Sequence, residues 1–117
     1  MWAVIDSDFL PEAAKERIFA AEEVFVSVAS IWEIAIKHAL GKGGMPVSAG
    51  EAAQAFDDAG YLSLPIQREH AFRLTTLRPL HRDPFDRLLV AQALSEPLTL
   101  LTRDRVVASY SDAIALV

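Results

Sequence analysis

Two aspartates lie close together in the stretch Arg82-Asp83-Pro84-Phe85-Asp86-Arg87. Asp83 followed by proline is typical of a helix start, because its carboxylate accepts free backbone N–H groups and proline suits the first helical position. Asp86 lies one turn further on, where a carboxylate can either favour the helix dipole or hold a hard cation such as Mg²⁺ or Mn²⁺. The positions of the other carboxylates bear on this choice.

Two further carboxylates follow apolar segments with a strand pattern. Glu33 lies in the first turn of the helix expected after residues 23–30, and Asp104 lies two residues after the apolar run 98–102. Asp86 opens the helix that leads into that second strand. Ligands of open parallel sheets bind beyond the carboxyl ends of the strands, so we expect these acids at one edge. Carboxylates gathered there would repel one another without a divalent cation between them.

Each of these acids also has a structural explanation when it is taken alone. Ser30-x-x-Glu33 matches a capping box, and Glu33 is spaced to pair with Lys37 on the helix surface. Asp86 occupies the third position of its helix, and Asp104 could cap a short helix at residues 105–110. Only their expected convergence on one edge favours a metal site over helix capping.

The histidines and Trp32 carry weaker signals. His38, His70 and His81 share no spacing that would suit a metal, and we expect each at the surface. Trp32 is interpreted as a core residue or as an anchor of a dimer interface.

The rest of the chain alternates between strand and helix patterns. A strand at 23–30 runs into a helix closed by Gly41, and Ser48 to Glu51 resembles a capping box that opens a helix ending at Gly60. Its apolar side is predicted to be Ala52, Phe56 and Ala59. Later strands are expected at 61–66, 98–102 and 113–117, with helices at 67–77 and 84–96 and a loop at 78–84. This alternation predicts an α/β fold in which helices cover both faces of a parallel sheet.

Composition narrows the class of protein. The 117 residues fit one compact domain, and the absence of cysteine excludes disulfides, zinc–thiolate sites and thiol nucleophiles. No secretory signal or membrane-spanning pattern is present, so a cytoplasmic protein is predicted. The net charge of −5 argues against a general nucleic-acid binder. Basic residues nevertheless lie close to the acidic motifs, namely Lys37, Lys42, Arg78, Arg82, Arg87, Arg103 and Arg105.

Three segments together resemble the PIN-domain family, specifically the VapC-type toxins of bacterial toxin–antitoxin pairs. They are VSVASIWEIAIKHALGKG, HRDPFDRLLVAQAL and LTLLTRD, in the order and spacing of the family. The resemblance implies a three-layer α/β/α domain over residues 1–117, an acidic cluster that binds Mg²⁺ or Mn²⁺, and cleavage of RNA phosphodiester bonds. It also implies a cognate antitoxin as partner and a homodimer.

The same resemblance assigns roles to individual acids. Glu33 matches the acid of WEIAIK, Asp86 the second acid of DPFD, and Asp104 the acid of TRD. These three are therefore expected to be catalytic and to bind the metal. Asp83 matches the first acid of DPFD and is given the helix-capping role.

The N-terminus departs from the family pattern. Family members usually begin with an apolar strand that ends in an aspartate, whereas Met1-Trp2 here matches the end of the following helix, with residues 10–18 matching the next helix. This alignment predicts that the central strand is missing by truncation. A catalytically impaired binding module, which pairs with an antitoxin or with itself, is then the alternative function. A competing alignment takes residues 2–8 as the first strand and makes Asp6 the missing acid.

Overall fold

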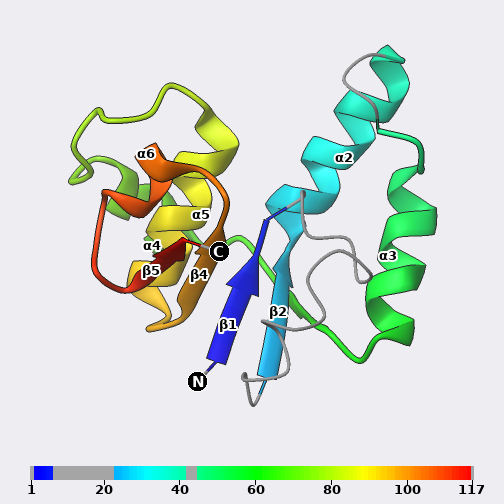
Figure 1. Ribbon diagram of the computed structural model, residues 1–117, viewed down its shortest axis with the longest axis horizontal. Coiled ribbons are helices and arrows are strands. Elements are labelled where there is room, and N and C mark those ends of the chain that lie inside the picture. The colour runs from blue at the N-terminus through cyan, green and yellow to red at the C-terminus, as the bar shows by residue number, and fades with distance from the viewer. Residues whose placement is uncertain (1, 7–22, 42–44, 117) are drawn as a thin grey trace.

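The computed structural model describes residues 2–6, 23–41 and 45–116 (Figure 1). Its framework is a five-stranded sheet in the order β3-β2-β1-β4-β5, in which every neighbouring pair is parallel. The parallel α/β sheet that the sequence predicts is confirmed. The strands are β1 (Trp2–Ile5), β2 (Glu23–Ser27), β3 (Leu62–Leu64), β4 (Thr99–Thr102) and β5 (Ile114–Leu116).

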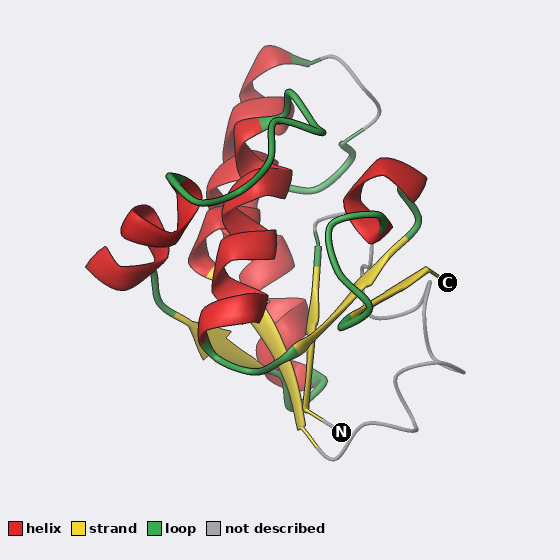
Figure 2. Cartoon of the chain, turned by 90° about the vertical axis from the view of Figure 1, so that its left-hand side faces the viewer, coloured by secondary structure: helices red, strands yellow, loops and turns green. Residues whose placement is uncertain are grey.

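Helices pack against both faces of this sheet. They are α2 (Val28–Leu40), α3 (Ala49–Asp58), α4 (Arg68–Leu74), α5 (Pro84–Ser95) and α6 (Arg105–Ala108). Side chains of α2 and α3 share one apolar cluster with the sheet, and those of α5 and α6 share another. Figure 2 views the molecule from the side that carries α4, α5 and α6. The result is the three-layer α/β/α arrangement.

The central strand shows why the sheet is apolar on both faces. Ala3 and Ile5 join the cluster beneath α2 and α3, whereas Val4 joins the cluster beneath α5, and all three side chains are 0% exposed. Because β1 pairs with both β2 and β4, the prediction that the central strand is missing is wrong. Residues Trp2–Ile5 supply it, as the competing alignment proposed, and Asp6 follows at its carboxyl end.

Local sequence signals set most helix ends, but the predicted end of β2 and the predicted capping box at Ser30 differ from the structure. Ser48 and Glu51 form the predicted capping box, and Gly41 closes α2 with a positive φ of 64° that glycine adopts without strain. Strand β2, however, ends at Ser27, whose hydroxyl caps α2 by accepting the N–H of Ala29. Ser30 therefore lies inside the helix, and its predicted capping box with Glu33 does not form.

Two other predictions concern the buried side of α3 and the helix expected at residues 10–18. Ala52 and Phe56 are buried on α3 as expected, but Ala59 is exposed because the helix ends before it. The helix expected at residues 10–18 lies outside the described residues. Within the described parts of the chain, no helix is long and apolar enough to span a membrane.

Candidate metal centre

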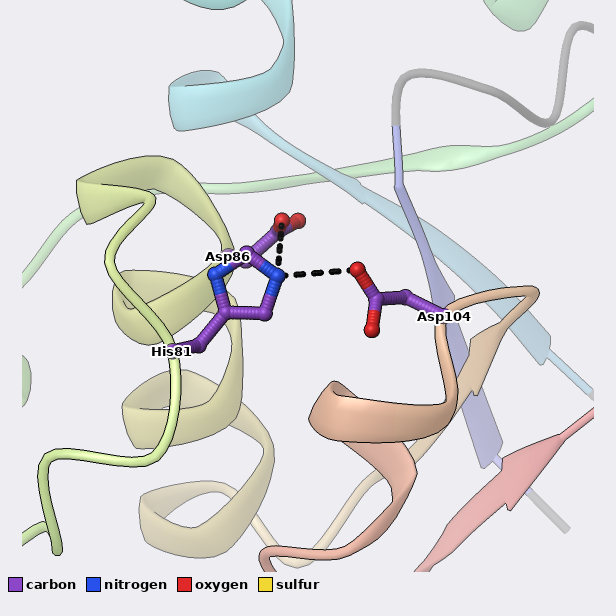
Figure 3. A group of neighbouring side chains, drawn as sticks. All are labelled: His81, Asp86 and Asp104. Atoms are coloured by element: carbon purple, nitrogen blue, oxygen red, sulfur yellow. Dashed lines mark hydrogen bonds and ion pairs between the residues drawn. The ribbon is translucent and has the colours of Figure 1, made fainter.

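Three polar side chains converge beyond the carboxyl ends of the strands (Figure 3). Asp86 lies in the first turn of α5, Asp104 follows β4, and His81 belongs to the loop that precedes α5. One ligand atom from each lies within 4.8 Å of the other two. His81 Nε2 is 2.8 Å from Asp104 Oδ2 and 3.4 Å from Asp86 Oδ2, so the imidazole lies between the two carboxylates.

Asp104 serves two structural purposes at once. Its Oδ1 accepts the backbone N–H groups of Val106 at 2.8 Å and Val107 at 3.2 Å, which caps the short helix α6. These bonds fix the carboxylate so that Oδ2 points toward His81. The capping role and the position in the cluster, treated as alternatives from sequence, are therefore compatible.

Asp83 holds the start of α5, as its sequence position indicates. Its Oδ1 accepts the N–H groups of Phe85 at 2.8 Å and Asp86 at 3.4 Å, with Pro84 at the first helical position. The cap leaves the carboxylate of Asp86 one turn in, facing the cluster.

His81 is held by a hydroxyl far away in sequence. Tyr110 Oη accepts the N–H groups of Leu80 at 3.1 Å and His81 at 2.9 Å, and so fixes the loop against the end of α6. The N–H of Asp83 donates to His81 Nδ1 at 3.0 Å. Nδ1 is therefore the acceptor nitrogen, and Nε2 carries the proton that is donated to Asp104.

The tautomer with the proton on Nε2 limits the part that His81 can take in binding a metal ion. A nitrogen that carries a proton cannot ligate a cation, so direct binding through Nε2 would require His81 to give up its bond from Asp83. The carboxylate oxygens have no such restriction, and they are the ligands that Mg²⁺ and Mn²⁺ prefer. The cluster fits a hard divalent cation held by carboxylates, with His81 orienting one of them.

Two buried acids lie at the same edge. Glu33 is 5% exposed on α2 and its Oε2 is 3.2 Å from Lys37 Nζ, the predicted pairing along the helix. Asp6 is 7% exposed directly after β1. Since Ile5 lies beside Val26 and Leu101 in the sheet, Asp6 emerges between the ends of β2 and β4.

Asp86 is the carboxylate of the cluster whose pKa is raised. Burial raises the pKa of Asp86 to about 6, and the negative charges of Asp83, Glu33 and Asp104 add to this, while His81 opposes it. The hydrogen bond from His81 lowers the pKa of Asp104, and the same bond raises the pKa of His81. A buried carboxylate whose pKa is raised by its acidic neighbours favours an added cation.

A buried network of hydrogen bonds joins α5 to the start of α2. Ser27 Oγ donates to Gln92 Oε1 at 2.6 Å, and Gln92 Nε2 donates to Pro65 O at 3.3 Å. Gln92 Nε2 also lies 3.4 Å from His70 Nδ1. Ser27, Gln92 and His70 are each 0% exposed. The network ties α5, which carries Asp86, to the start of α2, which carries Glu33.

The structure corrects the expectation that the histidines lie at the surface. His38 is exposed, but His70 is fully buried and His81 is mostly buried between two carboxylates. The burial of both residues depends on the distant partners Tyr110, Gln92 and Asp104, although His70 Nδ1 also accepts the N–H of Gln67 at 2.9 Å at the start of α4. The only local hint for His81 is its place two residues before the cap of α5.

A family model described as PIN domain matches residues 1–112. The chain belongs to the PIN-domain family. This confirms the family recognised from the three sequence segments, and the first strand and Asp6 fall inside the matched region. No curated protein matches the chain at a significant level.

Solved structures share this PIN fold at low sequence identity. VapBC2 from Rickettsia felis, bound to a DNA fragment from its promoter, has a chain that is 13% identical with a TM-score of 0.70, and the match covers 100% of this chain and 98% of that one. VapBC-5 from Mycobacterium tuberculosis is 17% identical with a TM-score of 0.71, covering 99% and 97%. FitAcB from Neisseria gonorrhoeae is 19% identical with a TM-score of 0.67, covering 100% and 97%.

Proposed function

We propose that this chain is a metal-dependent endoribonuclease and the toxin component of a toxin–antitoxin pair, acting as one PIN domain over residues 1–117 in the cytoplasm. The observation that carries the proposal is the convergence of Asp86 and Asp104 at the edge where Glu33 and Asp6 are buried. Burial, and after it the charges of neighbouring carboxylates, raise the pKa of Asp86, so a bound cation would stabilise its ionised form.

We assign the metal to Glu33, Asp86 and Asp104, with Asp6 as a fourth acid. When bound, Mg²⁺ or Mn²⁺ would activate a water molecule for attack on phosphorus and offset charge on the leaving oxygen. His81 holds Asp104 in its orientation by donating from Nε2. Lys37, 3.2 Å from Glu33, supplies positive charge beside that carboxylate.

The alternative, a catalytically impaired binding module, loses its main support. It rested on the absence of the first strand and its aspartate, and both are present as Trp2–Ile5 and Asp6. Asp6 follows the central strand of the sheet, where the family pattern expects its acid.

We propose a cognate antitoxin as partner and a homodimer as the assembly. VapBC-5 is named as a member of a family of toxin–antitoxin systems, and a further similar structure, from Klebsiella pneumoniae, is named as a toxin–antitoxin complex, which supports the first assignment. An apolar stripe lies exposed along α2, made of Val28, Trp32, Ile36 and Leu40. Trp32 is 56% exposed and so is not a core residue, and its ring lies 4.9 Å from that of Phe85, next to Asp86. A contiguous apolar surface of this kind suits a protein partner.

The test is cleavage of single-stranded RNA by the purified chain with Mg²⁺, with Mn²⁺ and with a chelator. We expect cleavage only with metal, and a loss of at least about 100-fold in Asp86→Asn, since one ligand and its charge are removed. Asp57→Asn, which alters an exposed acid of α3, is the matched control and should cleave normally. Metal-independent cleavage, or full activity in Asp86→Asn, would contradict the proposal.

A further inference from the structure

The surface made by α4 and the loop that follows it differs in charge from the rest of the chain. Residues 67–82 hold four arginines and one carboxylate, a formal charge of +3 in a chain whose total is −5. Arg68, Arg73, Arg78 and Arg82 are all exposed. In the described residues, none of these four forms an ion pair with a carboxylate. Their charges are therefore available to an anionic ligand.

An aromatic ring stands exposed among these arginines. Phe72 on α4 is 59% exposed, and the guanidinium carbon of Arg68 lies 5.5 Å from its ring centroid. Proteins that bind single-stranded nucleic acid combine these two features, since bases stack on aromatic rings and on guanidinium planes while cations contact the phosphates. An acidic protein segment would use the arginines but would gain little from the exposed ring.

The packing of α4 on α5 places Phe72 close to the candidate metal centre. Arg87 Nη2 lies 3.5 Å from Leu74 O, and Gln92 Nε2 lies 3.4 Å from His70 Nδ1, so the two helices run antiparallel. Phe72 is thus level with a point about one turn along α5 from Asp86, roughly 5 Å along the axis. The axes of packed helices lie about 8–10 Å apart. Because His70 is the residue buried against α5, the exposed ring of Phe72 lies on the other side of α4, and a few nucleotides would span from it to the site.

The loop between α4 and α5 is a fixed connection rather than a loose one. Arg78 Nη2 donates to Ser109 O at 3.3 Å, and Tyr110 Oη accepts two N–H groups of the loop. Exposed arginines thus occur along the chain from Phe72 to His81, and the side chain of His81 reaches the cluster. Residues 67–82 appear on the same side of the sheet as α5 (Figure 1).

We propose that α4 and residues 75–82 bind single-stranded RNA next to the scissile phosphate, with one base stacked at Phe72 and the arginines contacting the backbone. This assignment rests on the proposed function, because it names the surface that brings RNA to the same site. Phe72 then sets how well the site accepts unpaired RNA, while the metal centre carries the cleavage.

The test measures binding alone. A dye-labelled single-stranded RNA is titrated with the full-length protein in a metal chelator, and affinity is followed by fluorescence anisotropy at several salt concentrations. Phe72→Ala should weaken binding by about 5- to 100-fold, the usual worth of one stacked base, and Phe72→Trp should retain it. Arg73→Gln should reduce the salt slope by about 0.7. Leu62→Ala, a truncation of an exposed apolar side chain at the start of β3, is the control and should bind normally.

Two results would overturn the proposal. One is unchanged RNA affinity and salt slope in Phe72→Ala, with thermal melting as for the unaltered protein. The other is a Phe72→Ala variant that loses a copurifying protein partner while its RNA affinity stays the same, which would assign the surface to that partner. Phe72-dependent RNA binding in a protein that never cleaves RNA would refute the nuclease and leave this surface intact.

Discussion

The Nε2 proton of His81 is donated to Oδ2 of Asp104 across 2.8 Å, while Oδ1 of the same carboxylate caps α6. Each oxygen of Asp104 therefore has a separate task. The bond also sets the charge of the site, because it lowers the pKa of Asp104 and raises that of His81.

Removing this donor should weaken the metal site without unfolding the domain. We expect His81→Ala to lower Mn²⁺ affinity and RNA cleavage by about 10- to 100-fold, as is usual when a residue that orients a metal ligand is lost. His81→Gln keeps a side-chain N–H and should recover much of this loss. Mn²⁺ titration followed by electron paramagnetic resonance measures the affinity directly. Equal affinity in His81→Ala and the unaltered protein would show that Asp104 needs no orienting donor.

The pKa of Asp86, about 6, predicts a pH dependence with a definite sign. The folded state holds this proton more tightly than the unfolded state, so without metal the contribution of Asp86 to stability is greatest below its ordinary pKa and declines as pH rises through 6. Metal affinity should rise over the same range, because the ionised carboxylate is the ligand.

Asp86→Asn isolates this effect. Without metal we expect it to raise the free energy of unfolding at pH 7.5 by about 1 kcal/mol, a value reduced for solvent screening of a partly exposed group. At pH 4 it should change little. Urea unfolding at both pH values, with and without Mg²⁺, is the measurement, and an equal effect at the two pH values would contradict the assigned pKa.

Asp6 offers a direct test of the first strand. If this buried carboxylate at the end of β1 joins the metal centre, Asp6→Asn should abolish RNA cleavage and most of the rise in melting temperature that Mg²⁺ produces. The comparison uses Asp112→Asn, an exposed acid of the loop before β5, which should behave as the unaltered protein does. A full metal response in Asp6→Asn would exclude this carboxylate from the site.

The buried network at Gln92 should matter for stability. Gln92→Leu leaves the hydroxyl of Ser27 and the carbonyl of Pro65 without their partner, and we expect a loss of about 2–4 kcal/mol in the free energy of unfolding. Gln54→Leu, which removes an exposed hydrogen bond to Asp58 on α3, is the matched control and should cost less than about 0.5 kcal/mol. In Ser27→Ala combined with Gln92→Leu, the loss should be smaller than the sum of the two single losses.

Periodicity and helix signals were sufficient to predict most of the fold. The capping box at Ser48, the Asp83-Pro84 helix start and Gly41 at the end of α2 each depend on neighbours within a few residues, so sequence alone reveals them. The prediction of a missing first strand is wrong because it follows the family pattern, whereas the apolar residues Ala3, Val4 and Ile5 themselves indicate a buried strand. Ala3, Val4 and Ile5 are apolar on both faces, the same signal that correctly identified β4.

The site was harder to predict because its geometry comes from distant contacts. His81 reaches Asp104 only because Tyr110, far along the chain, holds the loop in place. Its neutral tautomer depends in turn on the N–H of Asp83, whose position is set by the start of α5. The contact with Asp83 is local, but the contacts with Tyr110 and Asp104 leave no trace in local spacing.

The central strand also governs when the acidic edge of the sheet can form during synthesis. Ala3 pairs with Val24 on one side and with Thr99 on the other, so β1 cannot complete its pairing until β4, which lies far along the chain, has been made. Pairing across such a separation is slow, and the nascent chain cannot bring Asp6 and Asp104 to one edge before both are made. The edge at which these two acids meet therefore stays incomplete on the ribosome until synthesis has passed Asp104.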